Sequence, residues 1–113
     1  MGVPLYRTKA DFFRTLGHPA RIRILELLCE RDHAVHELRD QIVIEPSNLS
    51  QQLAVLRRTG LVASHRRDGE VVYSVGAPEV RDLLLAARRI ITTLAAAQTD
   101  FEPELTPASS SSR

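Results

Sequence analysis

The stretch from Pro46 to Gly60 combines short hydrogen-bonding side chains with arginines. Serine, asparagine and glutamine occupy its first half, two arginines stand near its end, and no carboxylate lies between Pro46 and Thr59. Amides and hydroxyls can hydrogen-bond to base edges in a DNA groove, and guanidinium groups neutralise phosphates. We expect base contacts from Asn48, Ser50, Gln51 and Gln52, and backbone contacts from Ser47, Arg57 and Arg58.

This stretch also has the hydrophobic spacing of a helix. Leu49, Leu53 and Leu56 recur at intervals of four and three residues, which places them on one side, and Gly60 is suited to follow the helix end. The polar side then faces outward. By itself this pattern also fits an amphipathic surface helix whose polar side only meets water.

The preceding segment supplies a partner for this helix. Val35, Leu38 and Ile42 predict a short helix over about 34–42, and Pro46 is well placed to begin the next one. Two short helices joined by a tight turn form a helix-turn-helix. The turn contains Val43, a β-branched residue that disfavours the left-handed conformation many such turns adopt.

A basic β-hairpin is predicted directly after the helix-turn-helix. Residues 61–66 and 71–75 are β-rich, and the Asp-Gly pair between them is a strong hairpin signal. Arg66 and Arg67 lie near the tip, where they could contact phosphates or a narrow minor groove. A hairpin in this position is a wing.

Three further helices complete a mainly α fold with one small hairpin, in the order α-α-α-α-β-β-α. Apolar residues at helical spacing predict helices over 5–16, about 19–30 and about 78–97. The last of these is more apolar than a surface helix of its length requires, so we expect it to pair with its copy in a dimer.

Length and composition predict one domain followed by a tail. Residues 1–98 of the 113 contain all the predicted elements, and acids, prolines and serines over 99–113 indicate disorder. The formal net charge is only +1, but Arg57 to Arg67 contains four arginines and no acid. The local positive field therefore matters more than the total.

Several classes of protein are disfavoured by the composition. The single cysteine, Cys29, fits a reducing compartment, and no apolar run is long enough for a bilayer span or a signal peptide. We therefore expect a cytoplasmic protein without a membrane partner. No phosphate-binding loop or nucleophile motif indicates an enzyme or a bound cofactor.

Three segments resemble the ArsR/SmtB family of bacterial winged-helix repressors. They are residues 16–28 (LGHPARIRILELL), 47–62 (SNLSQQLAVLRRTGLV) and 66–75 (RRDGEVVYSV), and the second is the most specific match. The resemblance implies a homodimer formed by the first and last helices. It also implies that two recognition helices enter successive major grooves of a partly palindromic operator, and that a signal relieves repression of nearby genes.

The metal sites common in that family are absent from this sequence. Ala34 and His36 stand where metal sensors often carry a cysteine pair, and the last helix has neither histidine nor cysteine. Cys29, His33 and His36 are an alternative ligand set, but three ligands without a fourth are a weak pattern, and Cys29 lies on a core stripe. We therefore expect no metal, and no residue pattern identifies the effector.

The residues predict a sequence-specific DNA-binding protein, and the resemblance implies that it is a homodimeric repressor of nearby genes. Two alternatives are a winged helix used only for protein interaction or dimerisation, and a metal-responsive repressor using Cys29, His33 and His36. The basic surface from Ser47 to Arg67, which contains no acid, argues against the first, because an interaction module has no need for a cationic helix and hairpin together.

Overall fold

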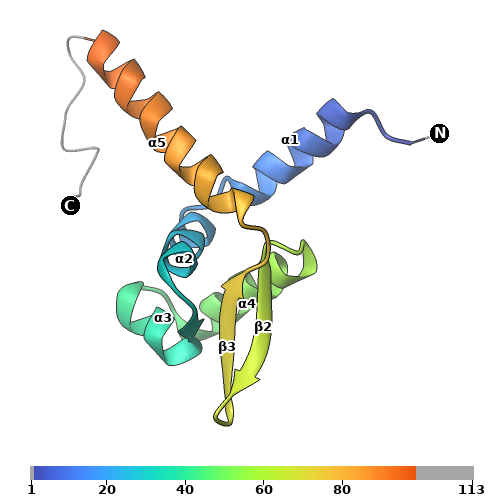
Figure 1. Cartoon of the computed structure of the whole chain (residues 1–113), viewed down its shortest axis with the longest axis vertical. Coiled ribbons are helices and arrows are strands. Elements are labelled where there is room, and N and C mark those ends of the chain that lie inside the picture. Colours follow the sequence, from blue (N-terminus) through green and yellow to red (C-terminus); the bar gives the residue numbers. More distant parts are fainter. Residues whose placement is uncertain (1, 99–113) are drawn as a thin grey trace. The chain divides into compact units, whose positions relative to one another are not determined.

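The computed structural model describes residues 2–98 and confirms the predicted winged helix-turn-helix (Figure 1). The elements in chain order are α1 Leu5–Leu16, α2 Pro19–Glu30, β1 His33–Ala34, α3 Val35–Gln41, α4 Pro46–Arg58, β2 Val62–Arg67, β3 Glu70–Val75 and α5 Glu79–Ala97. The tail predicted over 99–113 lies outside the described residues.

The chain divides into two compact units after Val80. The first unit contains α1 to β3, and the second contains the rest of α5, so each is described by itself. Within residues 2–98, no helix is long and apolar enough to cross a membrane. The assignment of residues 1–98 to one domain stays a prediction.

The core of the first unit lies between α2, α3, α4 and the strands. α2 contacts both α4 and β3, and α4 also contacts β2. The largest fully buried side chains are Ile24, Leu25, Leu38, Leu49 and Leu56. Cys29, on α2, is also buried, as its place on the apolar stripe indicated. Burial of the leucines of α4 against this core fixes the orientation of that helix.

The helix-turn-helix closes without the left-handed residue that Val43 made unfavourable. Ile42 and Glu45 are both extended, with φ, ψ of −127°, 129° and −63°, 138°. Among non-glycine residues of the described chain, only Asp68 has a positive φ. Extended backbone at both ends of the turn suits a β-branched residue such as Val43, whose side chain is fully exposed.

The wing is a hairpin with the expected two-residue turn. β2 pairs antiparallel with β3 in a register that sets Arg67 opposite Glu70. Asp68 and Gly69 between them have φ of 53° and 81°, the pair of positive values that a type I′ turn requires.

A third strand, β1, was not predicted from the sequence. It has two residues, His33 and Ala34, which pair with Tyr73 and Val72 to give the strand order β1-β3-β2. Two residues are too few to show an alternating pattern. The strand joins the start of α3 to the middle of β3.

Candidate nucleic-acid interface

The outward side of α4 is a straight stripe of exposed residues. Ser47, Gln51, Ala54 and Arg58 are separated by four, three and four positions, so they follow one line along the helix. All four are exposed, whereas the leucines on the opposite side are buried. The stripe therefore faces away from the core along the whole length of α4.

The other predicted contact residues of α4 border this stripe. Ser50 and Arg57 lie on one side of it and Asn48 on the other, and all three are exposed. Arg57 and Arg58 stand in the last turn of α4, where their charges also oppose the partial negative charge of the helix end. The stripe and its borders contain hydroxyl, amide, methyl and guanidinium groups but no acid.

Gln52 differs from the other candidates because its side chain is buried. It is 7% exposed. Its Oε1 accepts a hydrogen bond from Arg21 Nε at 2.7 Å, and its Nε2 donates to Asn48 Oδ1 at 2.8 Å. Both ends of the amide are thus engaged within the protein, which argues against the direct base contact expected from the sequence.

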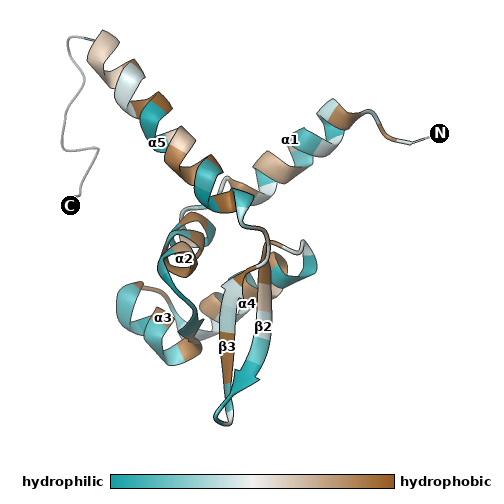
Figure 2. Ribbon diagram, viewed as in Figure 1, coloured by the Kyte–Doolittle hydropathy of each residue, from teal (hydrophilic) through white to brown (hydrophobic). Residues whose placement is uncertain are grey.

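The arginines of the wing are exposed, but each has a partner. Arg66 Nη1 donates to the carbonyl of Gly69 at 3.1 Å, which holds its guanidinium over the turn. Arg67 Nη2 donates to Asp32 Oδ2 at 3.5 Å. Figure 2 shows the hydrophilic colour spreading along β2 towards the hairpin turn, in contrast to the hydrophobic part of β3. The cationic side of the wing is therefore on β2.

Two histidines form further polar contacts at the wing. His36 Nδ1 on α3 lies 3.2 Å from Glu70 Oε2, and His65 Nε2 lies 3.9 Å from Asp32 Oδ2. Together with the Asp32–Arg67 pair, these contacts connect both strands of the hairpin to the segment that runs from α2 into α3. The wing and the helix-turn-helix are thus held as one surface.

The first helix of the helix-turn-helix is capped by a carboxylate. Glu37 Oε1 accepts a hydrogen bond from the Ala34 backbone N–H at 2.9 Å. This hydrogen bond is the largest of the causes that hold the pKa of Glu37 below its usual range; burial opposes it, and the charge and hydrogen bond of Arg31 reinforce it. Ala34 has no polar side chain, so Glu37 supplies the polar contact of this helix start.

The alternative metal site does not form in the described part of the chain. No group of three or more histidine, cysteine, aspartate or glutamate residues is arranged to hold a metal ion within residues 2–98. His33 is buried with its Nδ1 2.8 Å from the carbonyl of Arg31, whereas His36 is exposed beside Glu70. Cys29, His33 and His36 therefore do not converge as the spacing allowed.

Three residues that lie on this surface or contact it were not predicted from the sequence. Ala54 lies in the middle of the exposed stripe, and its spacing from Ser47 and Gln51 is the signal that could have identified it. Arg21 and Asp32 contact α4 and the wing from positions 31 and 35 residues away in the chain. No local pattern marks such partners.

Comparison with known proteins assigns the chain to a family. Residues 18–64, which contain α2, the helix-turn-helix and the start of the wing, match the model described as "Bacterial regulatory protein, arsR family". A relative from Mycobacterium tuberculosis, the HTH-type transcriptional regulator Rv0081, is 57% identical over 89 residues, 78% of either chain. The chain belongs to the ArsR family of transcriptional regulators. Its function is therefore regulatory rather than enzymatic.

Solved structures agree with this assignment. The crystal structure of Rv0081 is 52% identical and has a TM-score of 0.78 over 85% of this chain and 97% of that one.

Two further relatives in sequence have names that state the direction of regulation. The biofilm growth-associated repressor of Xylella fastidiosa is 36% identical over 84 residues, 74% of either chain. The transcriptional activator HlyU of Vibrio cholerae is 31% identical over 77 residues, 68% of this chain and 71% of that one. The relatives of this chain thus include a protein named as a repressor and one named as an activator.

Proposed function

We propose that this regulator is a homodimeric repressor that binds a partly palindromic operator, with α4 in the major groove and the wing on the DNA backbone. The observation that carries the proposal is the segment from Ser47 to Arg67, whose exposed residues combine base-compatible groups with arginines and which contains no acid. An α-helix of this kind fits the major groove of B-DNA.

The exposed side chains of α4 divide into two roles in this proposal. Ser50, Gln51 and Asn48 contact base edges, and the Ala54 methyl group suits contact with a thymine methyl. Ser47, Arg57 and Arg58 contact phosphates and fix the position of the helix. Gln52 is assigned to positioning instead, because it is buried.

The wing supplies the outer contacts. Arg66 and Arg67 are proposed to contact phosphates or a narrow minor groove beside the half-site. Arg67 must exchange its contact with Asp32 for one with DNA. The affinity of the wing for DNA then depends on how well the phosphates compete with the Asp32 carboxylate for Arg67.

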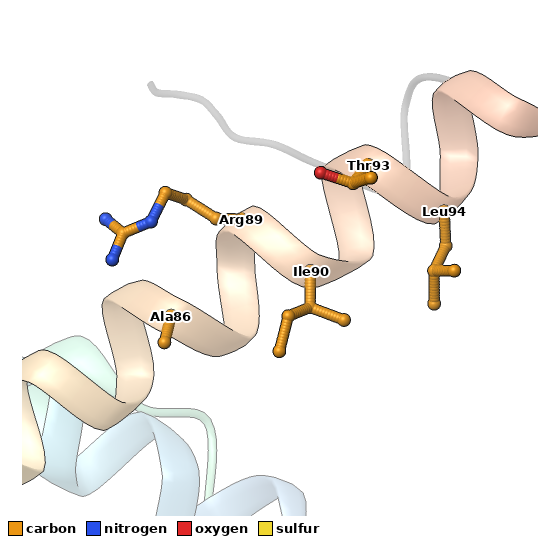
Figure 3. A pocket seen from close by; sticks show the side chains of 5 residues that line it. All are labelled: Ala86, Arg89, Ile90, Thr93 and Leu94. Carbon is orange, nitrogen blue, oxygen red and sulfur yellow. The ribbon is translucent and has the colours of Figure 1, made fainter.

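Dimerisation is supported by apolar residues that are exposed on α1 and, separately, on α5. On α1 the exposed side chains include Leu5, Tyr6 and Phe13. Figure 3 shows Ile90 and Leu94 extending from the same side of α5, and they are 58% and 57% exposed. Apolar patches of this kind on a small domain are typical of interfaces, and two-fold pairing would match a palindromic site.

Comparison with relatives that are named as a repressor or as an activator favours repression. The repressor from Xylella fastidiosa shares 36% identity with this chain, and the activator from Vibrio cholerae shares 31%. An in vitro transcription assay on a promoter carrying the operator tests the direction. A repressor lowers the transcript level as protein is added, and a rise would contradict this part of the proposal.

The DNA-binding proposal is tested by selecting duplexes from a randomised pool and measuring affinity by fluorescence anisotropy over a salt series. We expect a two-fold related consensus, and an affinity for it about 10³-fold or more above that for a scrambled duplex. Affinity for both duplexes should fall steeply with salt because bound counterions are released. Absence of binding to any duplex at low salt would favour the protein-interaction module instead.

A further inference from the structure

A chain of hydrogen bonds runs from the end of α1 through α2 to the exposed side of α4. Arg21 Nη1 donates to the carbonyl of Thr15 at 3.0 Å, and Arg21 Nε donates to Gln52 Oε1 at 2.7 Å. Gln52 Nε2 in turn donates to Asn48 Oδ1 at 2.8 Å. One guanidinium group therefore joins the last turn of α1 to the recognition helix.

Arg21 fixes the orientation of the side-chain amides of Gln52 and Asn48. A guanidinium has donors only, so Gln52 must turn its carbonyl oxygen towards Arg21 and its NH₂ towards Asn48. Asn48 must then present Oδ1 to Gln52 as an acceptor. An amide on an exposed helix surface is ordinarily free to flip, but this one has a defined orientation.

Burial makes this orientation persistent. Gln52 is 7% exposed and Arg21 is half-buried, so neither group can readily exchange its partner for water. We call the hydrogen-bonded chain from Thr15 through Arg21 and Gln52 to Asn48 the relay. Breaking it would leave a buried amide or a partly buried charge without a hydrogen bond, which is costly. Asn48 is itself exposed and lies at the border of the stripe.

We propose that Arg21 and Gln52 are positioning residues that set the sequence preference of Asn48. With one lone pair of Oδ1 taken by Gln52, Asn48 offers its NH₂ group to the DNA as a donor. The base it contacts should present an acceptor in the major groove, such as purine N7, guanine O6 or thymine O4. This inference rests on the proposed function and adds that one operator position is specified from the protein interior.

Gln52→Glu is the variant that separates the two links of the relay. A glutamate can still accept from Arg21 but cannot donate to Asn48, so the amide of Asn48 should turn its NH₂ group towards the carboxylate and present Oδ1 outward. We expect the base preference at one operator position in each half-site to fall about tenfold, while preferences at the other positions remain. The comparison uses ratios between duplexes that differ at one base pair, so a uniform effect of the added negative charge cancels.

Asn48→Asp provides a second test on an exposed residue, which does not depend on Gln52→Glu folding normally. It keeps the acceptor for Gln52 and removes the outward donor. The preference should be lost at the same operator position that Gln52→Glu affects. Arg23→Lys, a conservative change on the exposed side of α2 and outside the hydrogen-bonded chain, should leave every preference unchanged.

The outcomes distinguish this inference from the proposed function. If wild-type protein selects no consensus, the proposed function itself fails. If wild-type protein selects a consensus and Gln52→Glu and Asn48→Asp alter different positions, or alter none, the relay does not set specificity. A purely structural role for Gln52 would weaken binding to all duplexes by the same factor, which would also contradict the inference.

Discussion

Arg67 Nη2 and Asp32 Oδ2 lie 3.5 Å apart, which places a carboxylate beside a cationic residue of the wing. Exposed ion pairs contribute only about 0–1 kcal/mol to stability, so this contact matters little for folding. In the proposed binding mode its effect on DNA binding is larger, because Asp32 would compete with phosphates for Arg67 and also repel them. We therefore expect the carboxylate to moderate the affinity of the wing for DNA.

Asp32→Asn should tighten binding to every DNA sequence. Asparagine keeps an acceptor for Arg67 and removes the negative charge, so affinity should rise several-fold at low salt, and the gain should shrink as salt screens it. The measurement is DNA affinity by fluorescence anisotropy over a salt series. Asp11→Asn, which removes the same charge from α1, is the control and should change affinity less. Equal effects of the two variants would contradict this account of the wing.

Ile90→Glu should convert a dimer into a monomer. The substitution places a charge on the exposed apolar side of α5, where pairing with a second copy would bury it without a partner. Sedimentation velocity should show halved mass, and affinity should fall more for a duplex with two half-sites than for one. Thr92→Glu, about half a helical turn away, should remain dimeric. The account of the interface is wrong if Ile90→Glu sediments like wild type.

Glu37 should make the stability of the fold depend on pH in the acid range. Its pKa is lowered in the folded state by the hydrogen bond from the Ala34 N–H and by Arg31. Its contribution is therefore present above the pKa of the unfolded chain and is lost as pH falls through the folded value. Glu37→Gln should flatten the dependence of the urea midpoint on pH below about 5. An unchanged profile would show that the cap does not contribute.

Gly76→Ala should destabilise the first unit by about 1–3 kcal/mol. Gly76 follows β3, where its N–H donates to the carbonyl of Leu61 at 2.9 Å. A Cβ at this position would collide with the backbone carbonyl of Gly60, so the end of β3 would have to move away from the end of α4. Chemical denaturation measures the loss. Gly2→Ala, which meets no neighbour, should be neutral.

The sequence predicted the elements of the fold well because local signals mark their ends. Pro19 and Pro46 stand at the first helical positions, Gly60 follows α4 with a φ of 83°, and the Asp-Gly pair forms the hairpin turn. β1 escaped prediction because its pairing with β3 depends on residues some forty positions away.

The candidate site was predicted less completely, for a physical reason. Helical spacing places Gln52 near the leucine side of α4, but it does not show which partner the amide finds there. Gln52 is buried and accepts a hydrogen bond from Arg21, 31 residues earlier in the chain. The pairing of Asp32 with Arg67 spans 35 residues of the chain. Partners brought together only by tertiary structure leave no periodic pattern.

The most direct test of base recognition by α4 is the discrimination shown by Gln51→Ala. Gln51 is exposed in the centre of the stripe, and a specific base contact is worth about 1–3 kcal/mol. Affinities are measured for the selected duplex and for duplexes with single base-pair changes, with Gln98→Ala as a control for loss of an exposed glutamine outside the surface. We predict that Gln51→Ala loses about tenfold or more of the discrimination at one position per half-site, with little change on scrambled DNA. Discrimination equal to that of wild type at every position would contradict the assignment of α4 as the recognition helix.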